Sequence, residues 1–238
     1  MNNIDFFISN QRSGNSKTIP INECHEPLIA LGPLRKRLSI IIEPIYFLQE
    51  IHGAISETFV RESLVSKLEQ ARKLLPKGFS FVVLDAWRSL STQHALFDNY
   101  KNQILAENPD ISHDELLKRT SVYVSLPTAD PLNPPPHNTG GAIDLTIADQ
   151  NGNLLEMGTD FDDFTNKAQT VFFERDDISL TEQERMYREN RRLLLSVMKS
   201  VGFTNYHEEW WHFDYGDQLW ASISGSQYAR YGAIEPIK

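Results

Sequence analysis

A histidine and an aspartate that could bind a metal ion lie close together in residues 136–144. His137 and Asp144 flank a pair of glycines, and glycines let a backbone turn tightly or approach another group closely. Asp144 falls within an apolar run, residues 142–147. A carboxylate in such a run is costly to bury unless a cation or hydrogen-bond donors satisfy it. The segment therefore indicates a polar site within the fold.

Residues 207–214 supply further candidate ligands among several aromatic residues. A catalytic zinc ion needs three protein ligands with nitrogen or oxygen donors and one open position for water. His137, Asp144 and His212 meet this requirement without a cysteine, so we predict that they bind one zinc ion per chain. We interpret His207 as a neighbour of this site that does not bind the metal.

A hydrolase also needs a carboxylate that takes a proton from the attacking water and passes it to the leaving amine. Glu209, three residues before His212, is our candidate for this general base, and Glu208 competes with it. A helix would place Glu209 and His212 on one face, whereas a strand would place them on opposite sides. The spacing leaves this geometry open.

Arg88 is a third candidate for chemistry, because it follows closely after an expected strand at residues 79–84. An arginine at a strand end can reach into a cleft and stabilise the oxyanion that forms when water attacks a peptide carbonyl. The alternative is a surface ion pair between Arg88 and Asp85.

The combined motifs resemble those of the zinc D-Ala-D-Ala peptidases, which include the VanX-type D,D-dipeptidases and the zinc D,D-carboxypeptidases. The pattern His-x-x-Gly-x-Ala-x-Asp begins at His137, and Glu-x-Trp-His begins at Glu209. The dipeptidase branch is the closer match, through residues 85–88, 157–162 and 190–195. The resemblance covers about residues 80–215 in pieces.

The resemblance implies that zinc is bound by His137, Asp144 and His212, with Glu209 as the base and Arg88 as the group that supports the transition state. It also implies that Asp162 contacts the ammonium group of the substrate. The chain departs from the family at Pro135, where a serine is common, and at residues 87–89, where Tyr-Arg-Pro is common. These departures leave the metal motifs intact and affect the preference for a particular dipeptide.

The function that the resemblance implies is zinc-dependent hydrolysis of D-alanyl-D-alanine to two D-alanines, with a small D,D-dipeptide as the partner. One alternative is a D,D-carboxypeptidase that trims longer peptidoglycan peptides. A second is a non-catalytic binding module with a similar zinc site, as in Hedgehog signalling domains. The presence of Glu209 and Arg88, which serve chemistry, favours an enzyme.

The amino-acid composition excludes several other classes of protein. The chain has 238 residues, of which 40% are hydrophobic and 23% charged, as in soluble globular proteins. Its formal net charge of −9 gives no electrostatic reason to bind nucleic acid. Cys24 is the single cysteine, so no internal disulfide can form. We find no signal peptide and no run of the ~20 apolar residues that span a membrane, and we expect a cytoplasmic protein. The sequence does not indicate an oligomeric state.

Apolar periodicity predicts the elements that position these residues. We expect helices at residues 57–75, 91–106, 113–122 and 181–201, and strands at 79–84, 142–147 and 210–213. A proline-rich stretch, 127–136, is interpreted as a rigid loop that delivers the next segment into the site. Because helices and strands do not alternate regularly, we predict an α+β fold. It would be a single domain, residues 1–238, with a small antiparallel sheet flanked by helices, the zinc site at the sheet, and the first ~75 residues as a helical or loop extension.

Overall fold

The computed structural model describes residues 16–175 and 179–236. Its elements, in chain order, are η1 Ser16–Thr18, β1 Leu28–Ala30, η2 Gly32–Leu34, α2 Arg35–Leu38, β2 Ile40–Ile42, α3 Ile45–Leu48, β3 Phe59–Arg61, α4 Glu62–Arg72, β4 Ser80–Asp85, α5 Leu90–Glu107, α6 His113–Tyr123, η3 Pro136–Thr139, β5 Ala142–Ala148, η4 Asn166–Ala168, η5 Phe172–Glu174, α7 Glu182–Ser200, β6 Thr204–Asn205, β7 His212–Asp214 and α8 Gln218–Ser224.

A five-stranded sheet forms the centre of the fold. Its strand order is β2-β4-β5-β7-β6. The pairs β4–β5, β5–β7 and β6–β7 are antiparallel, whereas β2 joins the edge parallel to β4. A separate two-stranded sheet pairs β1 with β3, also antiparallel. The predicted α+β class with a mainly antiparallel sheet is confirmed, and the parallel edge is a feature that strand patterns alone did not predict.

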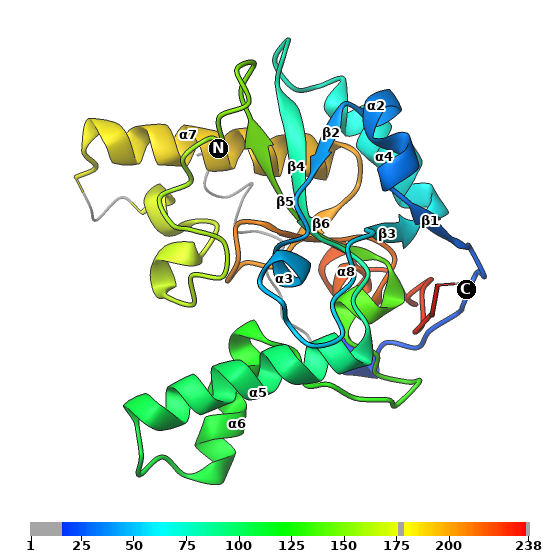
Figure 1. The fold of residues 1–238 in the computed structure, drawn as a ribbon, viewed down its shortest axis with the longest axis vertical. Coiled ribbons are helices and arrows are strands. Elements are labelled where there is room, and N and C mark those ends of the chain that lie inside the picture. The colour runs from blue at the N-terminus through cyan, green and yellow to red at the C-terminus, as the bar shows by residue number, and fades with distance from the viewer. Residues whose placement is uncertain (1–15, 176–178, 237–238) are drawn as a thin grey trace.

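Helices pack on the sheet through one continuous core. Leu194 and Met198 of α7 are buried in the same cluster as Ile143 of β5 and Leu64 of α4. Figure 1 shows α7 crossing behind the sheet and the α5–α6 hairpin lying apart from it, at the bottom of the view. The helices α4 and α7 therefore cover one face of the sheet, and Ile45 of α3 packs against Val82 and Leu84 on the other face. The α5–α6 hairpin faces the end of the sheet where the candidate site lies.

Three predicted helices are confirmed as α5, α6 and α7. Each begins at a side-chain cap: Ser89 accepts from the backbone of Thr92, Ser112 from Glu115, and Thr181 forms a capping box with Glu184. Such caps satisfy backbone N–H groups that have no partner within the helix. The three helices begin within one residue of the starts predicted from apolar periodicity.

The predicted helix at residues 57–75 is wrong at its N-terminal end. Residues 59–61 form β3, and α4 begins only at Glu62. Val60 pairs with Ile29 of β1, and the Phe59 carbonyl accepts a hydrogen bond from the backbone N–H of Trp87. These long-range hydrogen bonds override a helical periodicity that is local to the sequence.

The predicted strand at residues 210–213 is displaced. The observed strand β7 begins at His212, because Trp210 and Trp211 belong to the turn that precedes it.

The N-terminal third of the described chain shares the main core. Leu31, Leu38 and Val60 are buried with Phe81 of β4 and Trp211. On this basis we propose that the chain makes one domain. Within residues 16–175 and 179–236, no helix has both the length and the apolar character needed to cross a membrane.

Candidate metal centre and its surroundings

Two of the three candidate ligands lie opposite each other on neighbouring strands. Asp144 of β5 pairs with His212 of β7 in the antiparallel register, which places their side chains on one face. On the other side of β5, the register with β4 shifts between Val83 and Asp85, so that Asp85 also pairs with Asp144. This bulge re-aims the end of β4 toward the same point.

His137 reaches the strands from the short helix η3. Gly140 ends η3 with φ 71°, a left-handed conformation that favours glycine, and a Cβ there would meet Leu28. At Gly141 a Cβ would lie 2.6 Å from the carbonyl oxygen of Tyr215. The glycine pair is thus required for the chain to turn from η3 into β5, as its presence between His137 and Asp144 indicated.

Three acceptor atoms from these residues converge. One ligand atom each of His137, Asp144 and His212 lies within 4.8 Å of the others, and all three residues are buried. His137 Nε2 lies 3.2 Å from His212 Nδ1, and Asp144 Oδ1 lies 3.0 Å from the same Nδ1 atom. Charges of Asp214 and Asp144 raise the pKa of His212 well above its usual value despite the opposing effect of burial. This position therefore favours a positive charge.

Hydrogen bonds on the far side of each imidazole decide which nitrogen faces this point. His137 Nδ1 lies 2.6 Å from the Ala86 carbonyl oxygen, which can only accept, so Nδ1 donates and Nε2 carries the lone pair. His212 Nε2 lies 2.9 Å from Asp214 Oδ1, which leaves Nδ1 to face the site. Two imidazole nitrogens and a carboxylate turned toward one point make a donor set that fits a zinc ion.

Asp214 is a residue of this centre that the sequence analysis did not select. It is fully buried and lies two positions after His212 in β7, hence on the same face of the strand. A carboxylate that accepts from the second nitrogen of a metal-binding histidine fixes its tautomer and orientation. The signal that could have indicated it is its spacing of two from His212, which continues the strand alternation one residue beyond the predicted strand 210–213.

Glu209 lies in the turn before β7, which resolves the geometry that its spacing left open. The turn is held by Asn205, whose Nδ2 donates to the carbonyl oxygens of Glu209 and His212, each at 2.9 Å. Glu209 Oε2 lies 3.8 Å from His212 Nδ1. The carboxylate is buried, and burial raises its pKa well above the usual value, although the charge of His212 acts in the opposite direction. A raised pKa strengthens a general base.

Arg88 is held from several sides. Asp85 Oδ2 accepts from Nε at 3.0 Å and lies 2.8 Å from Nη2, and Gln93 Oε1 accepts from Nη1 at 2.9 Å. The guanidinium also lies over the ring of Tyr46, 4.8 Å from its centre. A guanidinium has five N–H groups, so one on Nη1 and one on Nη2 remain, the latter 3.6 Å from Asp144 Oδ2. The ion pair with Asp85 therefore coexists with donors left for the site.

Gln93 was not selected from the sequence. It is buried on the second turn of α5, and its Nε2 donates to the Ser125 carbonyl oxygen at 2.7 Å. It thereby links Arg88 to the loop that leads to His137. No spacing rule in the sequence indicated this link, because it joins a helix, a strand end and a loop.

Asp162 lies in the loop between β5 and η4. Its Oδ1 accepts a hydrogen bond of 3.1 Å from the Tyr46 hydroxyl, and its backbone has φ 59°, which is uncommon for a residue other than glycine. Burial and the charge of Asp144 raise the pKa of Asp162 to about 7. Because its surroundings disfavour the anionic form, this carboxylate would be stabilised by a cationic partner such as an ammonium group.

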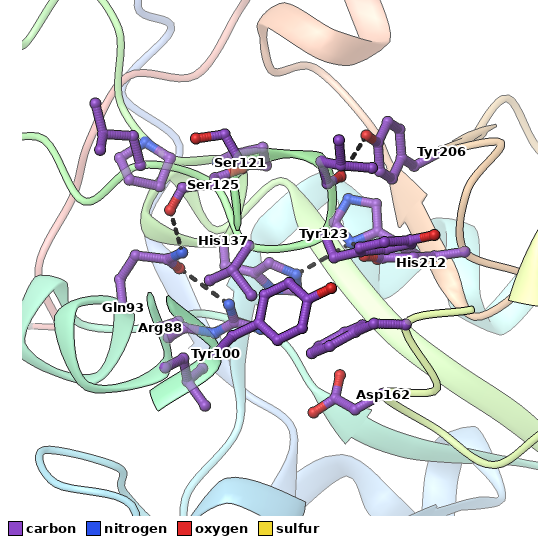
Figure 2. A pocket seen from close by; sticks show the side chains of 18 of the residues that line it. Arg88, Gln93, Tyr100, Ser121, Tyr123, Ser125, His137, Asp162, Tyr206 and His212 are labelled. Atoms are coloured by element: carbon purple, nitrogen blue, oxygen red, sulfur yellow. Dashed lines mark hydrogen bonds and ion pairs between the residues drawn. The ribbon is translucent and has the colours of Figure 1, made fainter. Parts of the chain in front are cut away.

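All six predicted site residues line one cavity of about 700 Å³. They are Arg88, His137, Asp144, Asp162, Glu209 and His212. Figure 2 shows the hydrogen bonds from Ser125 through Gln93 to Arg88, and the rings of Tyr100 and Tyr123 in the same pocket. Carboxyl groups line this cavity in greater number than the cations Lys17 and Arg88. Burial raises the pKa values of Glu209 and Asp162, and a metal cation bound nearby would favour their ionised forms.

Comparison with known proteins gives one consistent family. The M15 peptidase family, described as D-ala-D-ala dipeptidase, matches residues 53–231. A D-alanyl-D-alanine dipeptidase of Synechocystis sp. is 29% identical over 237 residues, covering 91% of this chain and 95% of that protein. A D-alanyl-D-alanine dipeptidase of Enterococcus faecium is 26% identical over 175 residues, covering 71% of this chain and 77% of that protein. A solved structure of the vancomycin resistance D,D-dipeptidase VanXYg is 22% identical with a TM-score of 0.35, covering 71% of this chain and 56% of that one.

Proposed function

The chain belongs to the M15 family of D-Ala-D-Ala dipeptidases, which are metallopeptidases, and we propose that it hydrolyses D-alanyl-D-alanine to two D-alanines at the cavity described above, with one zinc ion per chain. The observation that carries the proposal is the convergence of His137, Asp144 and His212 through lone-pair atoms that face one buried point. A zinc ion bound there would polarise the scissile carbonyl and acidify the attacking water.

The protein groups around this point have complementary roles in the proposed reaction. Glu209, buried and with a raised pKa, takes the proton of the attacking water and then delivers it to the leaving amine. The remaining N–H groups of Arg88 stabilise the oxyanion, and Asp85 and Gln93 hold the guanidinium so that little reorganisation is needed.

Asp162 is proposed to bind the substrate's ammonium group. The pairing of an ammonium group with a carboxylate is a charge-assisted hydrogen bond, which is stronger than a neutral one. The Tyr46 hydroxyl donates one hydrogen bond to Oδ1, and a carboxylate has lone pairs left on both oxygens to accept from the substrate. A free N-terminus is what distinguishes a dipeptide from the end of a longer peptide.

A D,D-carboxypeptidase is the second candidate, and the size of the cavity favours it. About 700 Å³ falls within the range of ~300–1,000 Å³ that holds drug-sized ligands, whereas a dipeptide of two alanines is smaller. A carboxypeptidase does not need the free ammonium group, so replacing Asp162 would leave its activity on longer peptides unchanged.

The deciding experiment measures D-alanine released from D-Ala-D-Ala by purified protein with zinc, after chelation and after zinc is restored. We expect turnover that chelation abolishes and zinc restores. A protein that binds zinc but releases D-alanine only from a longer peptidoglycan peptide would replace the dipeptidase proposal with the carboxypeptidase one.

A further inference from the structure

Arg191 on α7 is a buried cation whose hydrogen bonds all go to main-chain carbonyls among the described residues. Only 3% of its surface is exposed. Nε donates to the Met157 carbonyl oxygen at 2.7 Å, Nη1 to that of Gln169 at 2.7 Å, and Nη2 to that of Lys167 at 2.9 Å. A buried charge is expensive unless it is well satisfied, so these contacts define what the residue does in the fold.

The three carbonyl groups belong to the two ends of a single loop, residues 157–169. One guanidinium therefore holds both ends of the loop together, and Asp162 lies near its middle. Arg191 does not line the cavity, whereas Asp162 does. Because its N–H groups lie in one plane and Arg191 is part of α7, its three hydrogen bonds fix both ends of this loop relative to the helix.

Further contacts along the loop support the same shape. Asn190 Nδ2 donates to the Glu156 carbonyl oxygen at 2.8 Å, and Trp210 Nε1 donates to the Thr159 hydroxyl at 2.8 Å. Gly158 has φ 88°, and a Cβ there would lie 2.7 Å from the ring of Phe173. The loop is therefore built against α7 and the turn before β7 on its inner side.

Holding the loop in this way has an energetic cost. Burial lowers the pKa of Arg191 to about 9, with the charge of Asp163 acting in the opposite direction. The ring of Phe173, 4.7 Å from the guanidinium carbon, offsets part of this cost. Asp162 itself lies in the left-handed region, a conformation that persists only when its surroundings enforce it.

We propose that Arg191 is a positioning residue, which holds loop 157–169 in the shape that presents Asp162 to the ammonium group of the substrate. The inference rests on the proposed function. It joins two sequence motifs, residues 157–162 and 190–195, whose roles the metal centre alone does not explain.

The test compares Arg191→Lys with Arg192→Lys. Lysine keeps the charge at position 191 but cannot reach three carbonyl groups with a planar fork. Arg192, the next residue of α7, instead pairs with Glu174 and serves as the matched control. We expect Arg191→Lys to raise the KM for D-Ala-D-Ala about tenfold or more, to leave kcat within about threefold, and to retain stoichiometric zinc. Arg192→Lys keeps both constants.

A second measurement combines Arg191→Lys with Asp162→Asn. If Arg191 acts through Asp162, the double variant has the KM of Asp162→Asn alone, because the interaction is already lost. A fall in kcat at unchanged KM, or effects on KM that multiply, would overturn the proposal.

Hydrogen exchange of the amides in residues 158–168 separates this inference from the proposed function. Faster exchange in Arg191→Lys than in Arg192→Lys supports the holding role even if the wild-type protein does not cleave D-Ala-D-Ala. Equal exchange in the two variants would overturn it whatever the activity.

Discussion

His137 Nε2 lies 3.2 Å from His212 Nδ1, although the two residues are 75 positions apart in the chain. Each imidazole is turned by a fixed hydrogen bond on its far side, to Ala86 and to Asp214. Two ring nitrogens so close together, beside the carboxylate of Asp144, are stable only with a proton or a metal ion between them.

Metal removal is therefore expected to destabilise the fold as well as abolish activity. A ligand that binds only the folded state at a hundred times its dissociation constant adds about 2.7 kcal/mol, so chelation should lower the melting temperature by roughly 5–10 °C. Differential scanning calorimetry with and without chelator measures this. In a His212→Ala variant the chelator should cause no further shift, and a wild-type protein indifferent to chelation would contradict the metal site.

Asp214→Asn should weaken zinc binding about 10–100-fold, because the amide no longer serves as a carboxylate acceptor for His212 Nε2 and the preferred tautomer is lost. Competition with a chromophoric chelator gives the affinity. Asp149→Asn, at an exposed turn where the carboxylate accepts from Asn151 and Asn153, is the control. Wild-type affinity in Asp214→Asn would show that the second interaction of His212 has no influence on the metal.

Glu209→Gln should reduce kcat about 100–10,000-fold, since the amide cannot take a proton from water, while zinc content stays at one per chain. The neighbouring Glu208→Gln serves as the control. Glu208 accepts from Gln169 and lies 2.9 Å from His207 Nε2. We expect its replacement to change kcat by less than about threefold. Comparable losses in both variants would remove the assignment of Glu209 as the base.

Gln93→Met should lower kcat about tenfold or more with little change in KM, because Arg88 loses the acceptor that orients Nη1. In an Arg88→Met background the same replacement should have no further effect. The exposed Asn102, also on α5, gives the control Asn102→Leu. A rise in KM without loss of kcat would mean that Gln93 binds substrate directly.

The pKa of Asp162 predicts how its own contribution to the stability of the metal-free protein depends on pH. Its folded value of about 7 exceeds its ordinary value of 3.8, so the contribution of Asp162 to folding stability is fully present below about pH 4. That contribution is lost as the pH rises toward about 7. Asp162→Asn should therefore melt a few degrees higher than the wild type at pH 8 in the presence of chelator, and this difference should vanish near pH 4. If the difference in melting temperature between the two proteins were the same at pH 4 and at pH 8, the raised pKa of Asp162 would be contradicted.

The helices that frame the site could be predicted where the signals are local. The capping residues Ser89, Ser112 and Thr181 mark the starts of α5, α6 and α7, because a cap and a periodic apolar face involve residues only a few positions apart. The start of α4 could not be predicted in this way, since Val60 forms a strand only because Ile29 lies beside it.

The sequence by itself determined which side chains are available for chemistry: His137, Asp144, Glu209 and His212 in two motifs with the types and order of a metallopeptidase. The tertiary structure decided how they are used. Only the pairing of β5 with β7 sets Asp144 opposite His212, and only the turn before β7 brings Glu209 to the same face. Such contacts join residues far apart in the chain, and their geometry depends on strand register and packing, which no local spacing encodes.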